Sequence, residues 1–239
     1  MHWAWLLILF VLMAGSLFTM LIIVGFLFFL LGEWLFASPD YWNKRLQGNL
    51  PDDHNKILIY FISVLPEPVI KSVNIARVGD DEDCFKNEPF RVGFFRTIHN
   101  PFSFMGITST VIRIVDIRKS SLRARPDTIW HEYAHSYHNL LDETKSDFTS
   151  RWGKMGSGVI SDYARRNGLY EDVAEYVANF YLAITGYSSL FDYFWWHRLV
   201  WRVKLESCSQ KLVLLKDYGF IVESDYKKFL LKHPEFKTE

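Results

Sequence analysis

The sequence predicts an α+β domain that follows one N-terminal membrane-spanning helix. The first 32 residues of the 239-residue chain contain no Lys, Arg, Asp or Glu, so all 27 basic and 27 acidic side chains lie after them. In that charged part, short β-branched segments come first and segments with helical periodicity follow. Strands followed by helices are typical of α+β domains. About 200 residues are enough for one domain with its own core.

Residues 3–31 form an uninterrupted uncharged segment that is long enough to cross a bilayer. A membrane-spanning helix needs about 20 apolar residues. A cleaved signal peptide is the alternative, but it needs a basic start and an apolar stretch of roughly 7–15 residues. No Lys or Arg precedes this segment, which is about twice that length. We therefore interpret residues 1–36 as a transmembrane anchor and 37–239 as one folded domain.

The charges beside the anchor predict its orientation. Lys44, Arg45 and Lys56 follow the apolar segment, and no Lys or Arg precedes it. Positive residues near a membrane span favour the cytoplasmic side, so we expect a single-pass protein whose folded domain is cytoplasmic. The net charge near zero argues against nucleic acid as a partner. Two cysteines exclude a disulfide-rich scaffold.

The first half of the folded domain contains the predicted strands. Ser38-Pro39 predicts a short helix that runs to about residue 47. The apolar segment 55–64 fits either a helix or a buried strand, and Leu65-Pro66-Glu67-Pro68 is interpreted as a break. Strands are then expected at three places, of which the β-branched TSTVIRIVDI is the clearest: residues 69–78, 90–95 and 108–117.

The second half is predicted to be helical. Pro126-Asp127 opens a helix that runs to about residue 142, and a second helix covers 170–185 and ends at Gly186. Residues 145–169 contain four glycines and little apolar periodicity, so a loop is expected there. Three further helices complete the chain, the last of them capped by Ser224: residues 188–206, 210–218 and 225–231.

The helix predicted over 126–142 carries the motif His131-Glu132-Tyr133-Ala134-His135. Histidines at i and i+4 lie one above the other on one helix face, so their imidazoles can hold one Zn²⁺ ion together. Glu132 lies beside that face and can take a proton from a water on the metal. The alternative is a pair of solvent-exposed helix histidines without a metal.

A third ligand would distinguish a zinc site from a pair of exposed histidines without a metal. His138 shares the helix, but seven residues of helix separate it from His131 by about 10.5 Å, whereas zinc–nitrogen distances are about 2 Å. We therefore expect His138 to be a surface histidine or part of another site. Glu171 and Glu175, again at i and i+4, are the better candidates. One of them can bind zinc while the other accepts the second N–H of a ligand histidine.

These motifs carry a resemblance to a known family. The H-E-x-x-H sequence followed by a helix with E-x-x-x-E resembles the gluzincin zinc metallopeptidases. The segments SDYARRN at 161–167 and EDVAE at 171–175 are similar to the lethal-factor-like branch of that group. The resemblance covers about residues 107–185. One departure is the spacing between the tyrosine and the first glutamate, which is eight residues here and seven in the family pattern.

The resemblance implies a zincin-like peptidase fold and a role for each site residue. His131, His135 and Glu171 would bind zinc, and Glu175 would support a ligand histidine. Glu132 would be the general base. The upstream tyrosine of the family, which donates to the developing oxyanion, corresponds to Tyr163.

The resemblance also implies that strand 108–117 lies beside the cleft and pairs an extended substrate by strand addition; a plain core strand is the alternative. The function expected from the sequence is hydrolysis of peptide or protein substrates by a membrane-anchored, zinc-dependent enzyme. A catalytically silent zinc-fold binding or scaffold protein at the membrane is the alternative. The presence of all three ligands and the base favours the enzyme.

Overall fold

A computed structural model describes residues 54–79, 92–99, 111–119, 126–156, 159–187, 189–193 and 204–237, together with Met20. The chain divides into two units, Met1–Gly48 and Asn49–Glu239, and every described residue except Met20 belongs to the second. The predicted anchor segment 3–31 lies outside the described residues apart from Met20, and so does the helix expected at 39–47. Among the described residues, no helix has the length and apolar character needed to cross a bilayer.

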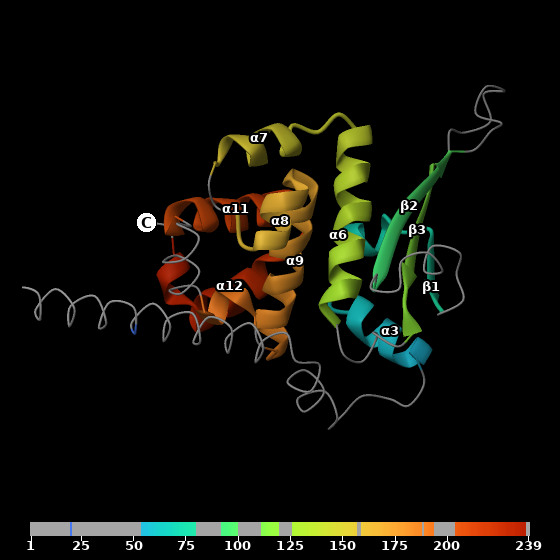
Figure 1. Cartoon of the computed structure of the whole chain (residues 1–239), viewed down its shortest axis with the longest axis horizontal. Coiled ribbons are helices and arrows are strands. Elements are labelled where there is room, and N and C mark those ends of the chain that lie inside the picture. Colours follow the sequence, from blue (N-terminus) through green and yellow to red (C-terminus); the bar gives the residue numbers. More distant parts are fainter. Residues whose placement is uncertain are drawn as a thin grey trace, which may run out of the picture. The chain divides into compact units, whose positions relative to one another are not determined.

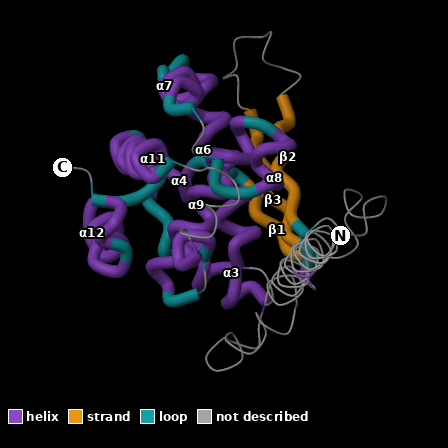
Figure 2. Tube along the Cα trace, turned by 60° about the vertical axis from the view of Figure 1, so that its left-hand side comes forward, coloured by secondary structure: helices purple, strands orange, loops and turns teal. Residues whose placement is uncertain are grey.

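The second unit is an α+β domain, as the sequence predicted, and helix α6 (Pro126–Glu143) lies at its centre. In Figure 1, α6 stands between a small sheet and a group of helices. That group begins with α8 (Asp162–Asn167) and α9 (Leu169–Thr185), and α11 (Leu205–Asp217) and α12 (Glu223–Lys232) lie beyond them. Figure 2 shows the strands gathered on one side of the helices.

The described sheet has three strands in the order β1-β3-β2. Strand β1 (Ile75–Val78) pairs with β3 (Val111–Ile117) in parallel, and β2 (Gly93–His99) pairs with β3 in antiparallel orientation. One face of the sheet packs on α6, because Arg113 of β3 donates to the side chains of Asn139 and Glu143 on that helix. Val115 and Ile117, two and four residues further along β3, are fully buried.

This topology corrects one expectation about β3. Its two neighbours occupy its parallel and antiparallel edges along Ile75–Val78 and Gly93–His99. A strand that is paired on both sides has no free backbone groups to offer a substrate. Along Ile114–Ile117, the prediction that strand 108–117 pairs a substrate is therefore wrong, and the alternative, a core strand, is correct; the pairing with β1 does not extend to Val111 and Ile112, and residues 108–110 lie outside the described residues.

The segments before β3 contain more helix than expected. The ambiguous segment 55–64 is the helix α3 (His54–Ile62), and α4 (Glu67–Lys71) replaces the first part of the predicted strand 69–78. The break predicted at Leu65-Pro66-Glu67-Pro68 is correct for Leu65 and Pro66, which lie between α3 and α4, but Glu67 and Pro68 already belong to α4. Pro66 is the N-cap of α4 and Pro68 lies in its first turn, where the missing N–H of proline is tolerated. The strand expected at 90–95 is Gly93–His99.

The loop predicted at 145–169 is also wrong, because it contains α7 (Phe148–Lys154) and α8. Phe148 and Trp152 lie one helical turn apart, and both are buried. Ser161 caps α8 by accepting a hydrogen bond from the backbone N–H of Ala164 at 3.0 Å. Gly168, at φ 99°, separates α8 from α9. Of the glycines that suggested a loop, Gly153 lies inside α7, Gly156 follows the C-cap of α7 and Gly168 caps α8, whereas Gly158 lies outside the described residues.

Helix α9 passes through the core and ends as predicted at Gly186, which adopts the left-handed conformation at φ 86°. The C-terminal helices pack an aromatic cluster against it that includes Phe191, Phe229 and Phe236. Helix α11 begins five residues earlier than the predicted 210–218. Helix α12 has Val222 as its N-cap residue, so Ser224 lies inside the helix and does not cap it.

The helix expected at 188–206 and one of the two cysteines lie partly or wholly outside the described residues. Of the helix expected at 188–206, the described part holds a short 3-10 turn, η3 (Leu190–Tyr193), and the first residues of α11. Cys208 is a free, buried thiol, and Cys84 lies outside the described residues.

Candidate metal centre

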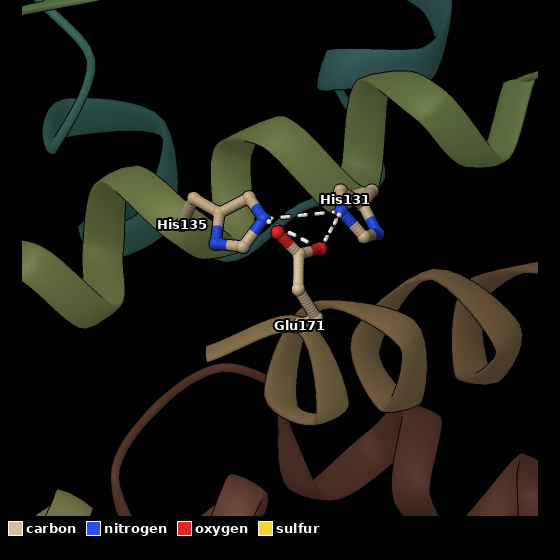
Figure 3. Close-up of side chains that lie close together, drawn as sticks. All are labelled: His131, His135 and Glu171. Atoms are coloured by element: carbon tan, nitrogen blue, oxygen red, sulfur yellow. Dashed lines mark hydrogen bonds and ion pairs between the residues drawn. The ribbon is translucent and has the colours of Figure 1, made fainter. Parts of the chain in front are cut away.

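Three side chains from two helices converge at the interface between α6 and α9. His131 Nε2 lies 3.0 Å from His135 Nε2 and 2.9 Å from Glu171 Oε2. The distance from His135 Nε2 to the same Glu171 oxygen is 3.3 Å. Figure 3 shows the two imidazoles pointing from one face of α6 toward the carboxylate on α9. The structure thus brings together the three residues that the sequence selected as ligands.

The local sequence explains why the helices present these side chains to each other. The histidines are one turn apart on α6, and buried neighbours fix the rotation of that helix. Trp130, for example, is fully buried and donates from Nε1 to the backbone oxygen of Phe61 at 2.8 Å. Glu171 belongs to the first turn of α9, directly after Gly168. Its position therefore depends on where α9 begins.

The donor set fits a zinc ion. Zinc–nitrogen and zinc–oxygen distances of about 2.0–2.2 Å in a tetrahedral site place neighbouring ligand atoms about 3.3 Å apart. The three observed separations are 2.9 to 3.3 Å. Two imidazole nitrogens and one carboxylate oxygen are also the ligand types of catalytic zinc sites that keep an open position. Among the described residues, these three side chains form the group whose ligand atoms lie close enough together to hold one metal ion.

The electrostatics of the cluster favour a positive charge. Burial by itself would lower the pKa of His131, but its hydrogen bonds to Glu171 and Glu175 outweigh burial and raise this pKa to about 10. Burial would likewise raise the pKa of Glu171, but hydrogen bonds from the two histidines lower it well below its usual range. Carboxylates that hold a proton on a buried imidazole would also stabilise a divalent cation at the same place.

Glu175 occupies a different place from Glu171, although both belong to α9. Its Oε1 atom lies 3.4 Å from Nδ1 of His131, on the side of the ring away from Nε2. A carboxylate at Nδ1 fixes the tautomer of a ligand histidine and leaves Nε2 for the metal. The geometry thus agrees with the two roles implied by the resemblance, which remain predictions.

Glu132 is buried, with 8 % of its surface exposed, and it packs against strand β2. A Cβ atom at Gly93 would lie 2.7 Å from its Oε1 atom and 2.5 Å from Cγ2 of Thr128. Only glycine leaves room for α6 to approach the strand this closely. Gly93 is a site residue that the sequence reasoning missed. A glycine inside an apolar strand pattern was the available signal.

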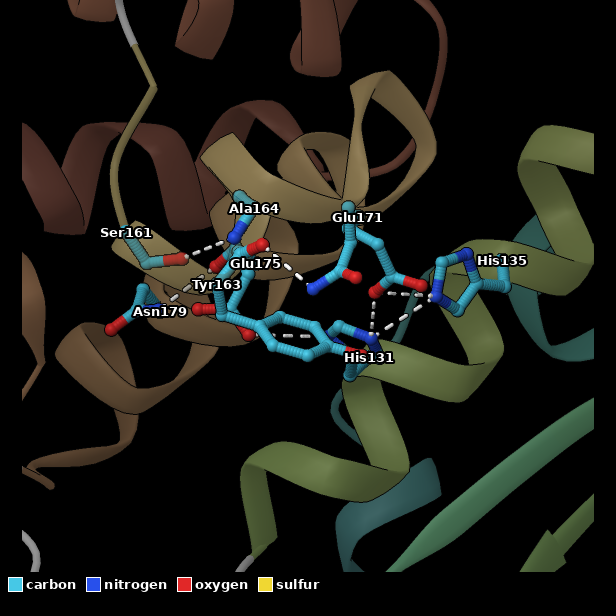
Figure 4. A network of polar contacts seen from close by, with 9 residues as sticks. His131, His135, Ser161, Tyr163, Ala164, Glu171, Glu175 and Asn179 are labelled. Carbon is cyan, nitrogen blue, oxygen red and sulfur yellow. Dashed lines mark hydrogen bonds and ion pairs between the residues drawn. The ribbon is translucent and has the colours of Figure 1, made fainter. Parts of the chain in front are cut away.

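Two aromatic rings complete the surroundings of the histidines. Tyr163 on α8 is 53 % exposed, and its ring centroid lies 6.3 Å from that of His131. Figure 4 shows the phenol ring beside His131, on the side where Glu175 also approaches. The second ring is that of Phe95 on β2, which stacks on His135 with centroids 6.4 Å apart. No sequence motif marked Phe95, because its contact depends on how the sheet packs on α6.

Of the two expectations for His138, a surface histidine or part of another site, the first is wrong. His138 is fully buried, and its Nε2 atom lies 2.7 Å from the hydroxyl of Thr149. Because that hydroxyl donates to Asp142, Nε2 of His138 is the donor to Thr149. The ring stacks on Tyr170 at 4.3 Å. His138 thus connects α6 to α7 and α9 and lies outside the three-ligand cluster.

No protein-family model matches this chain, and comparison with curated proteins and with solved structures gives no significant match.

Proposed function

We propose that this chain is a membrane-anchored, zinc-dependent peptidase, with residues 3–31 as the anchor in the bilayer and a zincin-like catalytic domain on the cytoplasmic side. The observation that carries the proposal is the convergence of His131, His135 and Glu171 within hydrogen-bond distance of one another. Glu132 follows the first of these ligands in the sequence, and its charge acts on His131. The H-E-x-x-H and E-x-x-x-E spacings support the assignment to the gluzincin type.

The proposed chemistry assigns separate tasks to the side chains. Zinc held by the cluster would supply Lewis acidity and lower the pKa of a water molecule to about 7. Glu132 would be the general base: it would accept a proton from the attacking water, whose oxygen would bond to the carbonyl carbon of the peptide bond. Tyr163, which is half-exposed beside His131, donates a hydrogen bond to the oxyanion. Glu132 then passes the proton to the leaving nitrogen, so the products are a carboxylate and an amine.

The surroundings of Glu132 suit this role. The carboxylate is buried against β2 and Thr128, so its position is fixed before a substrate arrives. A general base must lie within hydrogen-bond reach of the proton that it removes, directly or through one water. Glu175 keeps the imidazole of His131 oriented through Nδ1. Catalysis would then depend on side chains whose positions the fold sets in advance.

The test compares the full-length protein with a Glu132→Gln variant in detergent solution. Both should contain about one zinc per chain, because Glu132 is not a ligand. Cleavage of a broad peptide library should fall by about 10²-fold or more in the variant, because the amide cannot accept the proton. Glu206→Gln is the matched control, since Glu206 is exposed on α11. Zinc-loaded wild-type protein that cleaves no better than Glu132→Gln would favour the scaffold protein instead.

A further inference from the structure

A buried ion pair involves the residue that follows Glu171 in the sequence. The ammonium nitrogen of Lys211 on α11 lies 2.5 Å from Oδ2 of Asp172 on α9. Lys211 is 2 % exposed and Asp172 is 4 % exposed. Charged residues are rarely buried this completely unless they are paired. The complete burial of both charges therefore needs an explanation, whereas ion pairs at the surface are common.

The carboxylate of Asp172 has two further donors from other parts of the chain. Trp152 Nε1 on α7 donates to Oδ2 at 2.9 Å, and the backbone N–H of Ile160 donates to Oδ1 at 3.4 Å. The ammonium of Lys211 also lies over the rings of Trp152 and Tyr176, at 4.9 and 5.3 Å from the centroids. One carboxylate on α9 thus connects that helix to α7, to α11 and to the segment that leads into α8.

The location of the Asp172 carboxylate relates it to two helices of the proposed site, α9 with Glu171 and α8 with Tyr163. Asp172 follows Glu171 in the sequence and shares the first turn of α9 with it. Ile160 precedes Ser161, the N-cap of the helix that carries Tyr163. The Glu171 side chain contacts both histidines. Because Glu171 lies in the first turn of α9, the backbone of that turn determines where its carboxylate lies. Fixing Asp172 fixes that turn.

A buried pair of this kind is poorly explained by stability alone. Desolvation of two charges offsets much of their attraction, and well-packed apolar replacements are often as stable or more so. We infer that the Asp172–Lys211 pair is a positioning element that sets the location of Glu171 relative to His131 and His135. This inference rests on the proposed zinc site and does not depend on peptidase activity.

The experiment separates positioning from stability with two variants of the full-length protein. Lys211→Met leaves the Asp172 carboxylate buried without its partner, so both unfolding stability and zinc affinity should decrease. In Asp172→Asn/Lys211→Met no unpaired charge is buried, and the Asn oxygen can still accept from Trp152. Stability to urea should therefore recover in the double variant, whereas the connection to α11 remains lost.

Zinc affinity, measured by chelator competition, should remain about 10–100-fold weaker in the double variant, and the visible spectrum of the Co²⁺-loaded protein should differ from that of the wild type. Tyr181→Phe is the control. It removes a buried hydrogen bond of 3.0 Å between the same helix α9 and the backbone oxygen of Phe220. That variant should lose stability and keep both the wild-type zinc affinity and the wild-type spectrum.

Two results would overturn the inference in distinguishable ways. A double variant that regains wild-type zinc affinity together with stability would show that the pair only stabilises the fold, and the proposed zinc site would stand. Wild-type protein that binds no zinc would overturn both the site and the inference built on it.

Discussion

Helix α6 presents its histidines to two different environments, and the contrast explains which of them can form a metal site. His131 and His135 face the carboxylate of Glu171 on α9. His138, three residues further along the same helix, faces the hydroxyl of Thr149 and the ring of Tyr170. Hydrogen bonds to carboxylates overcome burial and raise the pKa of His131 to about 10. Burial dominates at His138 and lowers its pKa to about 4.

The first turn of α9 creates this difference with two adjacent residues. Tyr170 stacks on His138, whereas Glu171 reaches His131 and His135. Asp142, the carboxylate nearest to the His138 network, accepts hydrogen bonds from Thr149 and Tyr170. It therefore reaches His138 through a hydroxyl rather than directly. The residue that faces a histidine, more than the histidine itself, thus determines whether the site favours a cation.

The largest expected effect separates the two histidine environments by metal content. His135→Asn removes a proposed ligand, so zinc in the purified protein should fall from about one equivalent per chain to nearly none. His138→Asn should retain about one equivalent, because His138 lies outside the cluster. Elemental analysis after dialysis measures both. Equal zinc in the two variants would remove the distinction between the environments.

A second prediction compares the two tyrosines that accompany these histidines. Tyr163 lies beside His131, and Tyr170 stacks on His138. Tyr163→Phe should lower kcat by about 10²–10³-fold, as the loss of one oxyanion donor does, and leave zinc content unchanged. Tyr170→Phe should leave kcat essentially unchanged. If the two variants have the same kcat, the phenol of Tyr163 has no special part in the reaction.

The two glutamates of α9 allow a finer test within the metal environment. Glu171→Ala should abolish tight zinc binding, because a ligand is lost. Glu175→Ala should keep zinc but weaken its affinity by about 10–100-fold, since only the support of His131 Nδ1 is lost. Chelator competition distinguishes these outcomes. The reverse order would mean that Glu175 is the ligand.

The last prediction concerns the protonation of His138 and the stability of the folded protein. Its pKa is about 4 in the folded protein against an ordinary value of 6.5. As the pH falls below 6.5 the unfolded chain takes up a proton at this residue, and the folded protein does not until about pH 4. The free energy of unfolding should therefore fall through this window by up to about 1.4 kcal/mol per pH unit.

The His138→Gln variant removes this titration and keeps a donor for Thr149. Urea unfolding of both proteins without metal, between pH 7.5 and about 4.5, isolates the contribution of His138. The wild type should lose more stability than the variant as the pH falls. A difference in stability that stays constant with pH would show that His138 is not held neutral by the fold.

Local spacing predicted the parts of the molecule that depend on one helix at a time. Helices α6 and α9, and the end of α9 at Gly186, lie where the sequence predicted them. The meeting of Glu171 with the histidines also follows from spacings of four residues on two amphipathic helices. In each case the spacing of residues predicts which side chains share one helix face, and the burial of that face brings them into contact with the neighbouring helix.

Features that depend on distant pairing were not predictable in this way. The order β1-β3-β2 places β3 in the middle of the sheet, and no property of β3 alone indicates its neighbours. The burial of His138 depends on α7, which the glycines around it concealed. Phe95 and Lys211 are 40 and 39 residues from their contacts His135 and Asp172, and neither belongs to a motif.

Gly93 has a consequence for how a mutational map of this protein would look. Any side chain at this position meets Glu132 and Thr128 at less than 3.0 Å, so even alanine would push the strand and the helix apart. A saturation scan scored by activity should therefore rank position 93 with the site residues, although Gly93 has no side chain with which to react. In such a map, Gly93 would show the loss of activity expected for the proposed general base Glu132, because a side chain at position 93 would displace Glu132.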